Sequence, residues 1–406
     1  MTVAPQSTKI KDAFLTGEGV FRLSPVFVPR RFGSPGKRLR LHPDDYFALG
    51  TARGAIKERW FSSVIQCMNG PLAAPDEGLS YVAPTDNPTD RFTLKDAVDE
   101  LGAELVGQEL METYGGWPMY SKFFDYSTPL FLHLHLKFNS AERVGRLGKP
   151  EAYFFPPQLN NYMGDFPHTY FGFDPSVTKD DIRDRLLEYE ATDNRITELS
   201  RAHRIALGTG WYVPPGILHA PGSVLTYEPQ WNSDVNSIYE NMVSGEVYDY
   251  DFLVENCPQD KKRDIDYVID LMDWEKNVDP DFRKTYFRPP VVAHSDERYT
   301  EKWIVYATPY IAAKELTVLP GQTVTVKDDA AYGCILLQGF GRLGAHHAEA
   351  AIMLRYGQLS NDEFFVSEDA ARKGIVIENH SRSEPLVMLK HFGPNHPEMP
   401  QKTPLQ

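Results

Sequence analysis

Short alternating runs of apolar and polar residues dominate this chain and predict a mainly β protein. In residues 1–90 and 301–395 these runs are separated by clusters of Gly, Pro and Asp, a pattern typical of antiparallel sheets. In the second region they recur at a spacing of roughly ten residues, which favours a barrel or jelly roll. The strands predicted in the two regions are 19–24, 26–28, 60–65, 303–307, 314–319, 323–326, 334–337, 374–378 and 386–389.

Helical periodicity interrupts this pattern in four places. Apolar residues repeat at helical spacing in 93–111, whose first residue is a Thr suited to N-capping, and in 179–190, which Thr178 caps. A third helix is predicted at 194–203. The highly charged segment 260–277 also carries apolar residues in helical register, and we interpret it as part of a connector.

With 406 residues, the chain is long enough for two or three domains. We predict two β-barrel or jelly-roll domains with helical insertions. The N-terminal domain, 1–250, would carry insertions at about 93–111 and 178–203. A helical connector, 251–300, would lead to a C-terminal β domain, 301–406.

Charge and cysteine content exclude several classes of protein. The formal net charge of −14 argues against nucleic acid or an anionic membrane as the main partner, because both require a basic surface. The three cysteines lie far apart and form no Cys-x-x-Cys pair, so neither a disulfide framework nor a thiolate metal site is expected. The first eleven residues lack the apolar core of a signal peptide, and no segment has the length of a membrane span. We therefore expect a cytoplasmic protein, either a monomer or a homodimer.

The segment Pro129-Leu-Phe-Leu-His133-Leu-His135-Leu places two imidazoles on one face of an apolar strand. Side chains at positions i and i+2 of a strand point the same way, so His133 and His135 project together. Two imidazoles alone are weak evidence for a metal, because this spacing occurs in many ordinary strands. They become significant when further ligand types follow at suitable distances.

Two later segments supply such ligands. Glu151 follows in Gly-Lys-Pro-Glu-Ala-Tyr, and Gly208 to His219 fits the spacing of the second cupin motif, Gly-x5-Pro-x-Gly-x2-His. In that motif Pro and Gly set a tight turn that delivers the His into the mouth of a barrel. The sequence thus predicts one divalent ion held by His133, His135, Glu151 and His219, with Zn favoured and Fe, Mn, Ni or Co as alternatives.

The remaining histidines are interpreted as structural or exposed. His203 lies near the end of a predicted helix. His346 and His347 are adjacent, so on a strand they would face opposite ways and could not easily share a metal. The C-terminal region has no Pro-x-Gly-x2-His turn, and we expect no metal there.

Several motifs, in the right order, resemble the type I phosphomannose isomerases of the cupin superfamily. The resemblance covers roughly residues 20–245 and extends more loosely to the C-terminal barrel, which implies a bicupin fold. The motifs are Glu58-Arg-Trp60, Asn69-Gly-Pro-Leu, the helix 92–107, Pro129 to His135, Gly148-Lys149-x-Glu151-Ala-Tyr, Val213-Pro-Pro-Gly-x-x-His219-Ala, and Glu228-x-Gln230-x-Asn-Ser233-Asp234.

Carried over from that family, the metal ligands fall on the four predicted residues, but the chain departs from the pattern. The family usually has Gln at the position of His133, so the present set is richer in nitrogen. The Tyr-Arg that follows the family's Ser-Asp is absent after Asp234, and that Arg is taken to be catalytic in the family. Lys137, Arg143 and Arg146 are cations that could replace it.

The resemblance implies a metal-dependent isomerase that interconverts an aldose and a ketose through an enediol. In this interpretation Glu228 moves the proton, if burial raises its pKa, and Lys149 holds a sugar oxygen or a phosphate. Lys137, Gln230 and Asp234 are weaker candidates for binding the substrate. The absent Arg favours a sugar that is unphosphorylated or otherwise modified.

Two alternatives remain open. The first is mannose-6-phosphate isomerisation proper, and the second is an iron-dependent cupin oxygenase or a non-catalytic sugar-binding cupin. In every case the expected partner is a small sugar or sugar phosphate.

Overall fold

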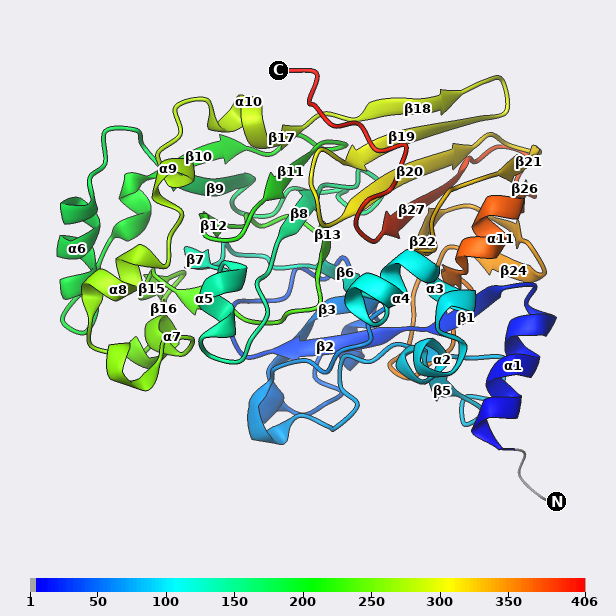
Figure 1. The fold of residues 1–406 in the computed structure, drawn as a ribbon, viewed down its shortest axis with the longest axis horizontal. Helices are drawn as coiled ribbons and strands as arrows, with labels where there is room; N and C mark the ends of the chain where they lie inside the picture. The colour runs from blue at the N-terminus through cyan, green and yellow to red at the C-terminus, as the bar shows by residue number, and fades with distance from the viewer. Residues whose placement is uncertain (1–4, 406) are drawn as a thin grey trace.

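The structure, a computed structural model, describes residues 5–405 and confirms a mainly β chain. Every pairing between its named strands is antiparallel, and no sheet of the described residues closes on itself. The description as two barrels therefore stays a prediction. Figure 1 shows the sheets running across the molecule, with helices α6, α8 and α9 gathered at one end.

Two sheets formed mainly by the N-terminal half face each other, and side chains from both sheets meet between them. The larger has the order β17 (Phe287–Arg288), β11 (Gly210–Val213), β8 (Glu151–Phe154), β13 (Thr226–Trp231), β6 (Met119–Phe124), β3 (Ala55–Phe61), β2 (Val26–Arg30). The smaller has the order β10 (Ser200–Arg204), β9 (His168–Phe173), β12 (Leu218–Ala220), β7 (His133–Leu134), β14 (Ser237–Ile238).

The C-terminal half contains two further sheets, and the start of the chain joins one of them. The nine-stranded sheet has the order β18 (Val291–Ser295), β19 (Tyr299–Val305), β20 (Ala312–Val318), β27 (Leu386–Phe392), β22 (Tyr332–Gln338), β25 (Glu363–Val366), β1 (Val20–Ser24), β4 (Tyr81–Val82), β5 (Phe92–Thr93). The four-stranded sheet has the order β21 (Thr323–Val326), β26 (Ile375–Asn379), β23 (Phe340–Leu343), β24 (His346–Glu349). Because β1 pairs with β25, the sheets cross the predicted boundary between the halves.

Eleven α-helices fall within the described residues. They are α1 (Gln6–Thr16), α2 (Leu94–Leu101), α3 (Ala103–Val106), α4 (Gln108–Tyr114), α5 (Phe138–Glu142), α6 (Lys179–Leu187), α7 (Tyr250–Val254), α8 (Ile265–Asp270), α9 (Trp274–Asn277), α10 (Phe282–Tyr286) and α11 (Glu368–Lys373). Short 3-10 helices occupy Pro43–Asp45, Thr51–Arg53, Gly70–Leu72, Ile196–Leu199 and Gln259–Lys261. A two-stranded hairpin joins β15 (Met242–Val243) to β16 (Glu246–Val247). No helix of the described part is long and apolar enough to cross a membrane.

The helix predictions are confirmed where a cap is present. Thr93 and Thr178 each form a capping box, with the carboxylates of Asp96 and Asp181. The helix predicted at 93–111 is divided into three, because Gly102 and Gly107 adopt positive φ angles of 51° and 93°.

The prediction of a helix at 194–203 is wrong. A 3-10 turn and strand β10 occupy this segment, and the backbone of β10 pairs with β9 instead of forming helical bonds. Helices α1 and α11 lie in regions predicted to be strands and loops.

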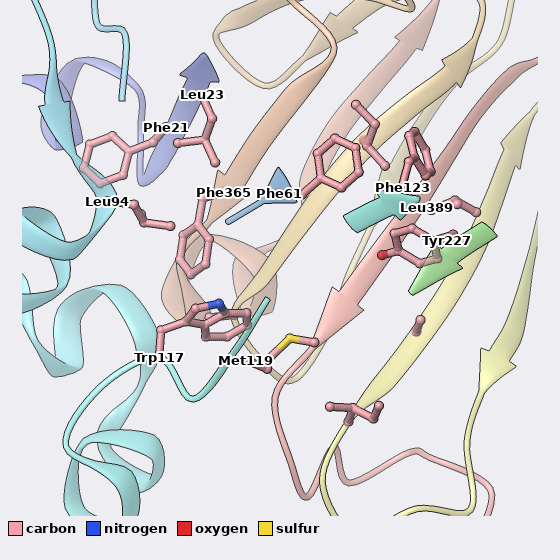
Figure 2. Close-up of a cluster of buried hydrophobic side chains, with 14 of the residues drawn as sticks. Phe21, Leu23, Phe61, Leu94, Trp117, Met119, Phe123, Tyr227, Phe365 and Leu389 are labelled. Atoms are coloured by element: carbon pink, nitrogen blue, oxygen red, sulfur yellow. The ribbon is translucent and has the colours of Figure 1, made fainter. Parts of the chain in front are cut away.

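A hydrophobic cluster joins the two halves of the molecule. Figure 2 shows Trp117 and Phe123 beside Phe365 and Leu389 from the C-terminal sheet, and all four are buried. Trp117 meets Phe365 edge-on, with ring centroids 5.0 Å apart. Burying such large aromatic side chains stabilises the contact between the halves.

Candidate metal centre and cavity

The smaller N-terminal sheet brings the three predicted imidazoles together. His133 begins β7 and pairs with His219 of β12, while His135 follows β7 and projects on the same side as His133. The predicted turn before His219 is present, since Gly216 has a φ of 88° and its N–H donates to the carbonyl of His135. One nitrogen of each imidazole lies within 4.8 Å of the others.

Glu151, at the start of β8, reaches this cluster from the facing sheet. Its Oε2 lies 3.0 Å from Nε2 of His135, and its Oε1 lies 3.0 Å from Nε2 of His219. All four side chains are buried. The structure therefore brings together the four residues that the sequence predicts as metal ligands.

The other nitrogen of each imidazole is held by the backbone. Nδ1 lies 3.1 Å from the carbonyl of Phe131 for His133, 2.7 Å from that of Val235 for His135, and 2.9 Å from that of Ile217 for His219. A carbonyl can only accept, so each Nδ1 carries the proton and each Nε2 presents a lone pair to the cluster. This is the tautomer that a metal requires.

The charge states also suit a metal. Burial lowers the pKa of His133 well below its usual value, and it lowers the pKa of His135 to about 4, so both are neutral near pH 7. Burial opposes ionisation of Glu151, but the charge of Lys149 and the neighbouring imidazoles of His135 and His219 outweigh it and hold the pKa of this carboxyl well below its usual value.

Buried polar atoms at the centre lack hydrogen-bond partners. Oε1 of Glu151 and Nε2 of His219 have none among the described residues, whereas Oε2 of Glu151 has the Lys149 ammonium 2.9 Å away. Buried polar groups are normally satisfied, and a cation at the centre would satisfy these. Three imidazole nitrogens and one carboxylate suit zinc or another divalent first-row ion, so the residues fit a metal.

Glu228, on β13, lies beside this centre between two lysines. Its Oε1 is 3.3 Å from Nζ of Lys122 and 3.4 Å from Nζ of Lys149. Burial, together with the negative charge of Glu151, raises the pKa of Glu228 to about 8 despite both lysines. Lys149 also lies 2.9 Å from Oε2 of Glu151, and these two carboxylates raise its pKa against the effect of burial. A carboxyl group with a pKa near working pH can both accept and donate a proton.

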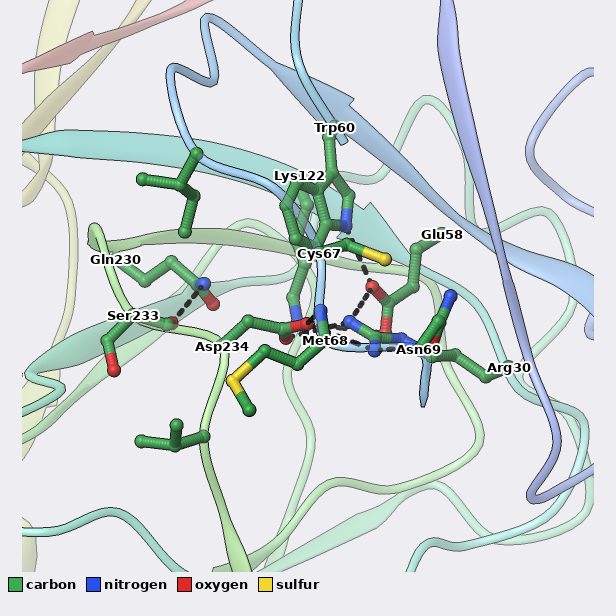
Figure 3. Close-up of polar contacts among 12 residues, drawn as sticks. Arg30, Glu58, Trp60, Cys67, Met68, Asn69, Lys122, Gln230, Ser233 and Asp234 are labelled. Atoms are coloured by element: carbon green, nitrogen blue, oxygen red, sulfur yellow. Dashed lines mark hydrogen bonds and ion pairs between the residues drawn. The ribbon is translucent and has the colours of Figure 1, made fainter. Parts of the chain in front are cut away.

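A second polar network adjoins the lysines, and sequence reasoning missed most of it (Figure 3). The Arg30 guanidinium binds Glu58 at 3.0 Å and both oxygens of Asp234 at 2.8 and 3.1 Å. Glu58 lies 3.7 Å from Lys122 and accepts from the indole N–H of Trp60 at 2.8 Å. The sequence marks Glu58 only as part of a family motif. Nothing local marks Lys122, which reaches the site because β6 pairs with β13 opposite Glu228.

Two residues predicted to bind the substrate lie away from the cavity. The Lys137 ammonium donates to the backbone carbonyls of Met272 at 3.0 Å and Asp270 at 3.4 Å, beside α8. Gln230 is fully buried and donates to the carbonyl of Ser233 at 3.2 Å. Neither lines the cavity, so we omit both from the proposed substrate site, whereas Asp234 does line it.

A cavity of about 700 Å³ opens over the candidate metal centre. This volume lies within the usual range for small-molecule sites. Its lining includes His133, His135 and Glu151, together with Glu228 and Lys149. Six carboxyl groups line it, those of Glu58, Glu151, Glu228, Asp234, Glu246 and Glu255. Five basic side chains also line it, those of Arg30, Arg31, Arg53, Lys122 and Lys149.

The histidines outside this site have other surroundings. His346 lies 3.0 Å from the carbonyl of Val20, and His347 lies 3.3 Å from Glu349. His203 packs against Trp211, with ring centroids 4.7 Å apart. Among the described residues, the three imidazoles of the candidate centre form the single group of three or more side chains spaced to hold a metal.

No protein-family model and no curated protein sequence matches the chain. Similar solved structures include the mannose 6-phosphate isomerase from Bacillus subtilis, with a TM-score of 0.59 and 18% identity over 92% of this chain and 99% of that one. A zinc-bound mannose 6-phosphate isomerase has a TM-score of 0.58 and 12% identity over 93% of this chain and 100% of that one. A mutant of phosphomannose isomerase from Salmonella typhimurium has a TM-score of 0.58 and 11% identity over 92% of this chain and 99% of that one. The resemblance predicted from the motifs is thus confirmed for the fold: this chain has the fold of the mannose 6-phosphate isomerases, at the low identity expected of a divergent relative.

Proposed function

We propose that this protein is a metal-dependent aldose–ketose isomerase acting on a sugar that carries no phosphate. One observation carries the proposal: a buried carboxyl group of raised pKa, Glu228, lies within 3.4 Å of two ammonium groups beside the three imidazoles and Glu151. Proton transfer between C1 and C2 of a sugar requires a base of this kind and positive charge where the enediol oxygens develop.

The residues divide the reaction between them. Glu228 takes the proton from C2 and returns it to C1, while Lys122 and Lys149 hold the adjacent oxygens. His133, His135, Glu151 and His219 would hold the metal. When bound, the metal would supply a Lewis acid that stabilises negative charge on a sugar oxygen.

The charges around the cavity support a neutral substrate. Of the cations that line it, Arg30 and Arg53 are each held by a carboxylate. Lys122 and Lys149 are likewise paired with Glu228. A phosphate would have to displace one of these carboxylates, which costs the free energy of the existing pair.

Mannose-6-phosphate isomerisation is the second candidate, and Arg31 favours it. Arg31 lines the cavity, is exposed, and has no hydrogen bond or ion pair within residues 5–405. The three-imidazole set keeps an iron oxygenase as a third and weaker candidate.

One experiment separates these candidates. The zinc-loaded and iron-loaded proteins are assayed for isomerisation of mannose and of mannose 6-phosphate, and for oxygen uptake with each sugar. We expect turnover of unphosphorylated sugar, with no oxygen consumed. A value of kcat/KM for mannose 6-phosphate more than a hundred times that for mannose would replace our proposal with the second candidate. We further propose a cytoplasmic location and a monomer or homodimer.

A further inference from the structure

A row of aromatic rings lines the cavity from the candidate metal centre to the protein surface. The ring centroid of Phe131 lies 5.5 Å from that of His133 and 4.9 Å from that of Tyr248. Tyr248 in turn lies 6.2 Å from Phe252. Phe131 is buried and Phe252 is 45% exposed, so the row begins beside a metal ligand and ends at the mouth of the cavity.

Separate parts of the chain build this wall, which we call the aromatic wall (Phe32, Phe131, Tyr248 and Phe252). Phe131 precedes β7, Tyr248 follows the β15–β16 hairpin, and Phe252 lies in α7. Phe32 broadens it, with its ring centroid 5.1 Å from that of Phe131. All four residues line the cavity, and none of them is needed for metal binding or proton transfer in the proposed isomerase.

Apart from Arg31, which precedes Phe32, the polar groups near the wall suit a neutral, hydroxyl-rich ligand better than an anion. Glu246 lines the cavity beside Tyr248, whose hydroxyl donates to it at 2.6 Å. Glu255, Asn236 and Asn256 also line this part of the cavity. Carboxylates repel a phosphate, whereas carboxylates and amides accept hydrogen bonds from sugar hydroxyls.

We propose that the substrate is a reducing disaccharide or longer saccharide, isomerised at its reducing end while the next ring packs on the aromatic wall. The proposal rests on the proposed isomerase function and names its substrate class. Neighbouring rings of the wall meet edge-on and Phe131 and Tyr248 are buried, so the ring open to a sugar is that of Phe252. The apolar C–H face of a pyranose ring packs flat on such a ring, while its hydroxyls point outward to polar groups. The reaction moves one proton from C2 to C1 and one between the two oxygens, and the glycosidic bond stays intact.

The test compares four reducing disaccharides (mannobiose, cellobiose, maltose and lactose) with their reducing-end monosaccharides. The zinc-loaded full chain, its Phe252→Ala variant and a Phe340→Ala control are assayed. Phe340 is 43% exposed and lies on β23 in the other half of the molecule. Its replacement by Ala therefore removes an exposed ring, as Phe252→Ala does, but far from the aromatic wall.

We expect at least one disaccharide to have a higher kcat/KM than its monosaccharide. Phe252→Ala should lower that ratio about 3- to 10-fold, the range of one aromatic packing contact, and Phe340→Ala should leave it unchanged. The proposal is overturned if monosaccharides are turned over and no disaccharide is preferred, or if Phe252→Ala changes the ratio no more than Phe340→Ala does.

A binding measurement tests the aromatic wall independently of whether the protein is an isomerase. The borohydride-reduced disaccharides cannot isomerise, so their affinity is measured by calorimetry in the same three proteins. Binding that weakens about 3- to 10-fold in Phe252→Ala supports the aromatic wall even if no sugar is turned over. Absence of binding by all four overturns the substrate class even if monosaccharides are isomerised.

Discussion

Replacing Glu228 by Gln removes the proposed proton-transferring group while keeping its shape. The amide still offers an oxygen to Lys122 and Lys149, which lie 3.3 and 3.4 Å from Oε1 in the parent protein. Because Glu228 is not one of the four proposed ligands, the metal content should not change. The variant therefore tests the chemical step without testing the metal site.

The expected loss is large and confined to kcat. General acid–base catalysis contributes about 10²- to 10⁴-fold, which corresponds to about 3–5 kcal/mol of activation free energy. KM should change little, since the two lysines and the candidate metal centre stay in place. Initial rates are measured on the zinc-loaded protein with the best neutral sugar, and zinc is determined on the same samples.

A matched control comes from the other half of the molecule. Glu363 is also buried, and burial raises its pKa to about 8, but it lies away from the cavity lining and pairs with Arg59. Glu363→Gln should retain kcat within about twofold. If Glu228→Gln kept its full metal content and more than a tenth of the parent kcat, Glu228 could not be the proton-transferring residue.

Three further predictions concern the metal, the core and pH. His219→Ala or Glu151→Ala should abolish stoichiometric zinc binding, measured by elemental analysis, whereas His346→Ala should retain it; full zinc in both site variants would refute the ligand set. Trp117→Ala should cost about 3–5 kcal/mol in urea unfolding, because it removes a buried indole that packs on Phe365, and a loss under about 1 kcal/mol would contradict its role. Between pH 5 and 8 the folded state keeps a proton on Glu363 that the unfolded state releases, so the contribution of Glu363 to stability falls as pH rises. Glu363→Gln should flatten that slope by up to about 1.4 kcal/mol per pH unit, and an unchanged slope would refute the raised pKa.

The candidate metal centre was predictable because each ligand sits in a short local pattern. His133 and His135 share a face through strand alternation, and a Pro-Gly turn delivers His219. The pairing of His219 with His133 depends on the contact of β12 with β7, and the facing of Glu151 toward them depends on packing between sheets. Local patterns therefore identify the candidate ligands, whereas the distances between them are set by the arrangement of the sheets.

The surroundings of the centre were not predictable in the same way. Lys122 reaches Glu228 through the register of β6 against β13, and Arg30 reaches Asp234 across 204 residues of chain. Strand register and long-range ion pairs leave no periodic signal in a single sequence. For the same reason Lys137 looked suitable by position, although its ammonium binds backbone carbonyls beside α8.

The ligand set alone does not choose among the candidate reactions, and the residues behind it carry more weight. Three imidazoles and a carboxylate serve oxygen chemistry as well as isomerisation. A buried carboxyl group between Lys122 and Lys149 has a direct use in moving a proton, and an oxygenase does not require it. Lys149 pairs with both Glu151 and Glu228, and Lys122 pairs with Glu228, so a dianionic phosphate bound there would meet two carboxyl groups as well as two ammonium groups. The charges next to the candidate metal ligands thus favour isomerisation of a neutral sugar, and the length of the aromatic wall favours one with more than a single ring.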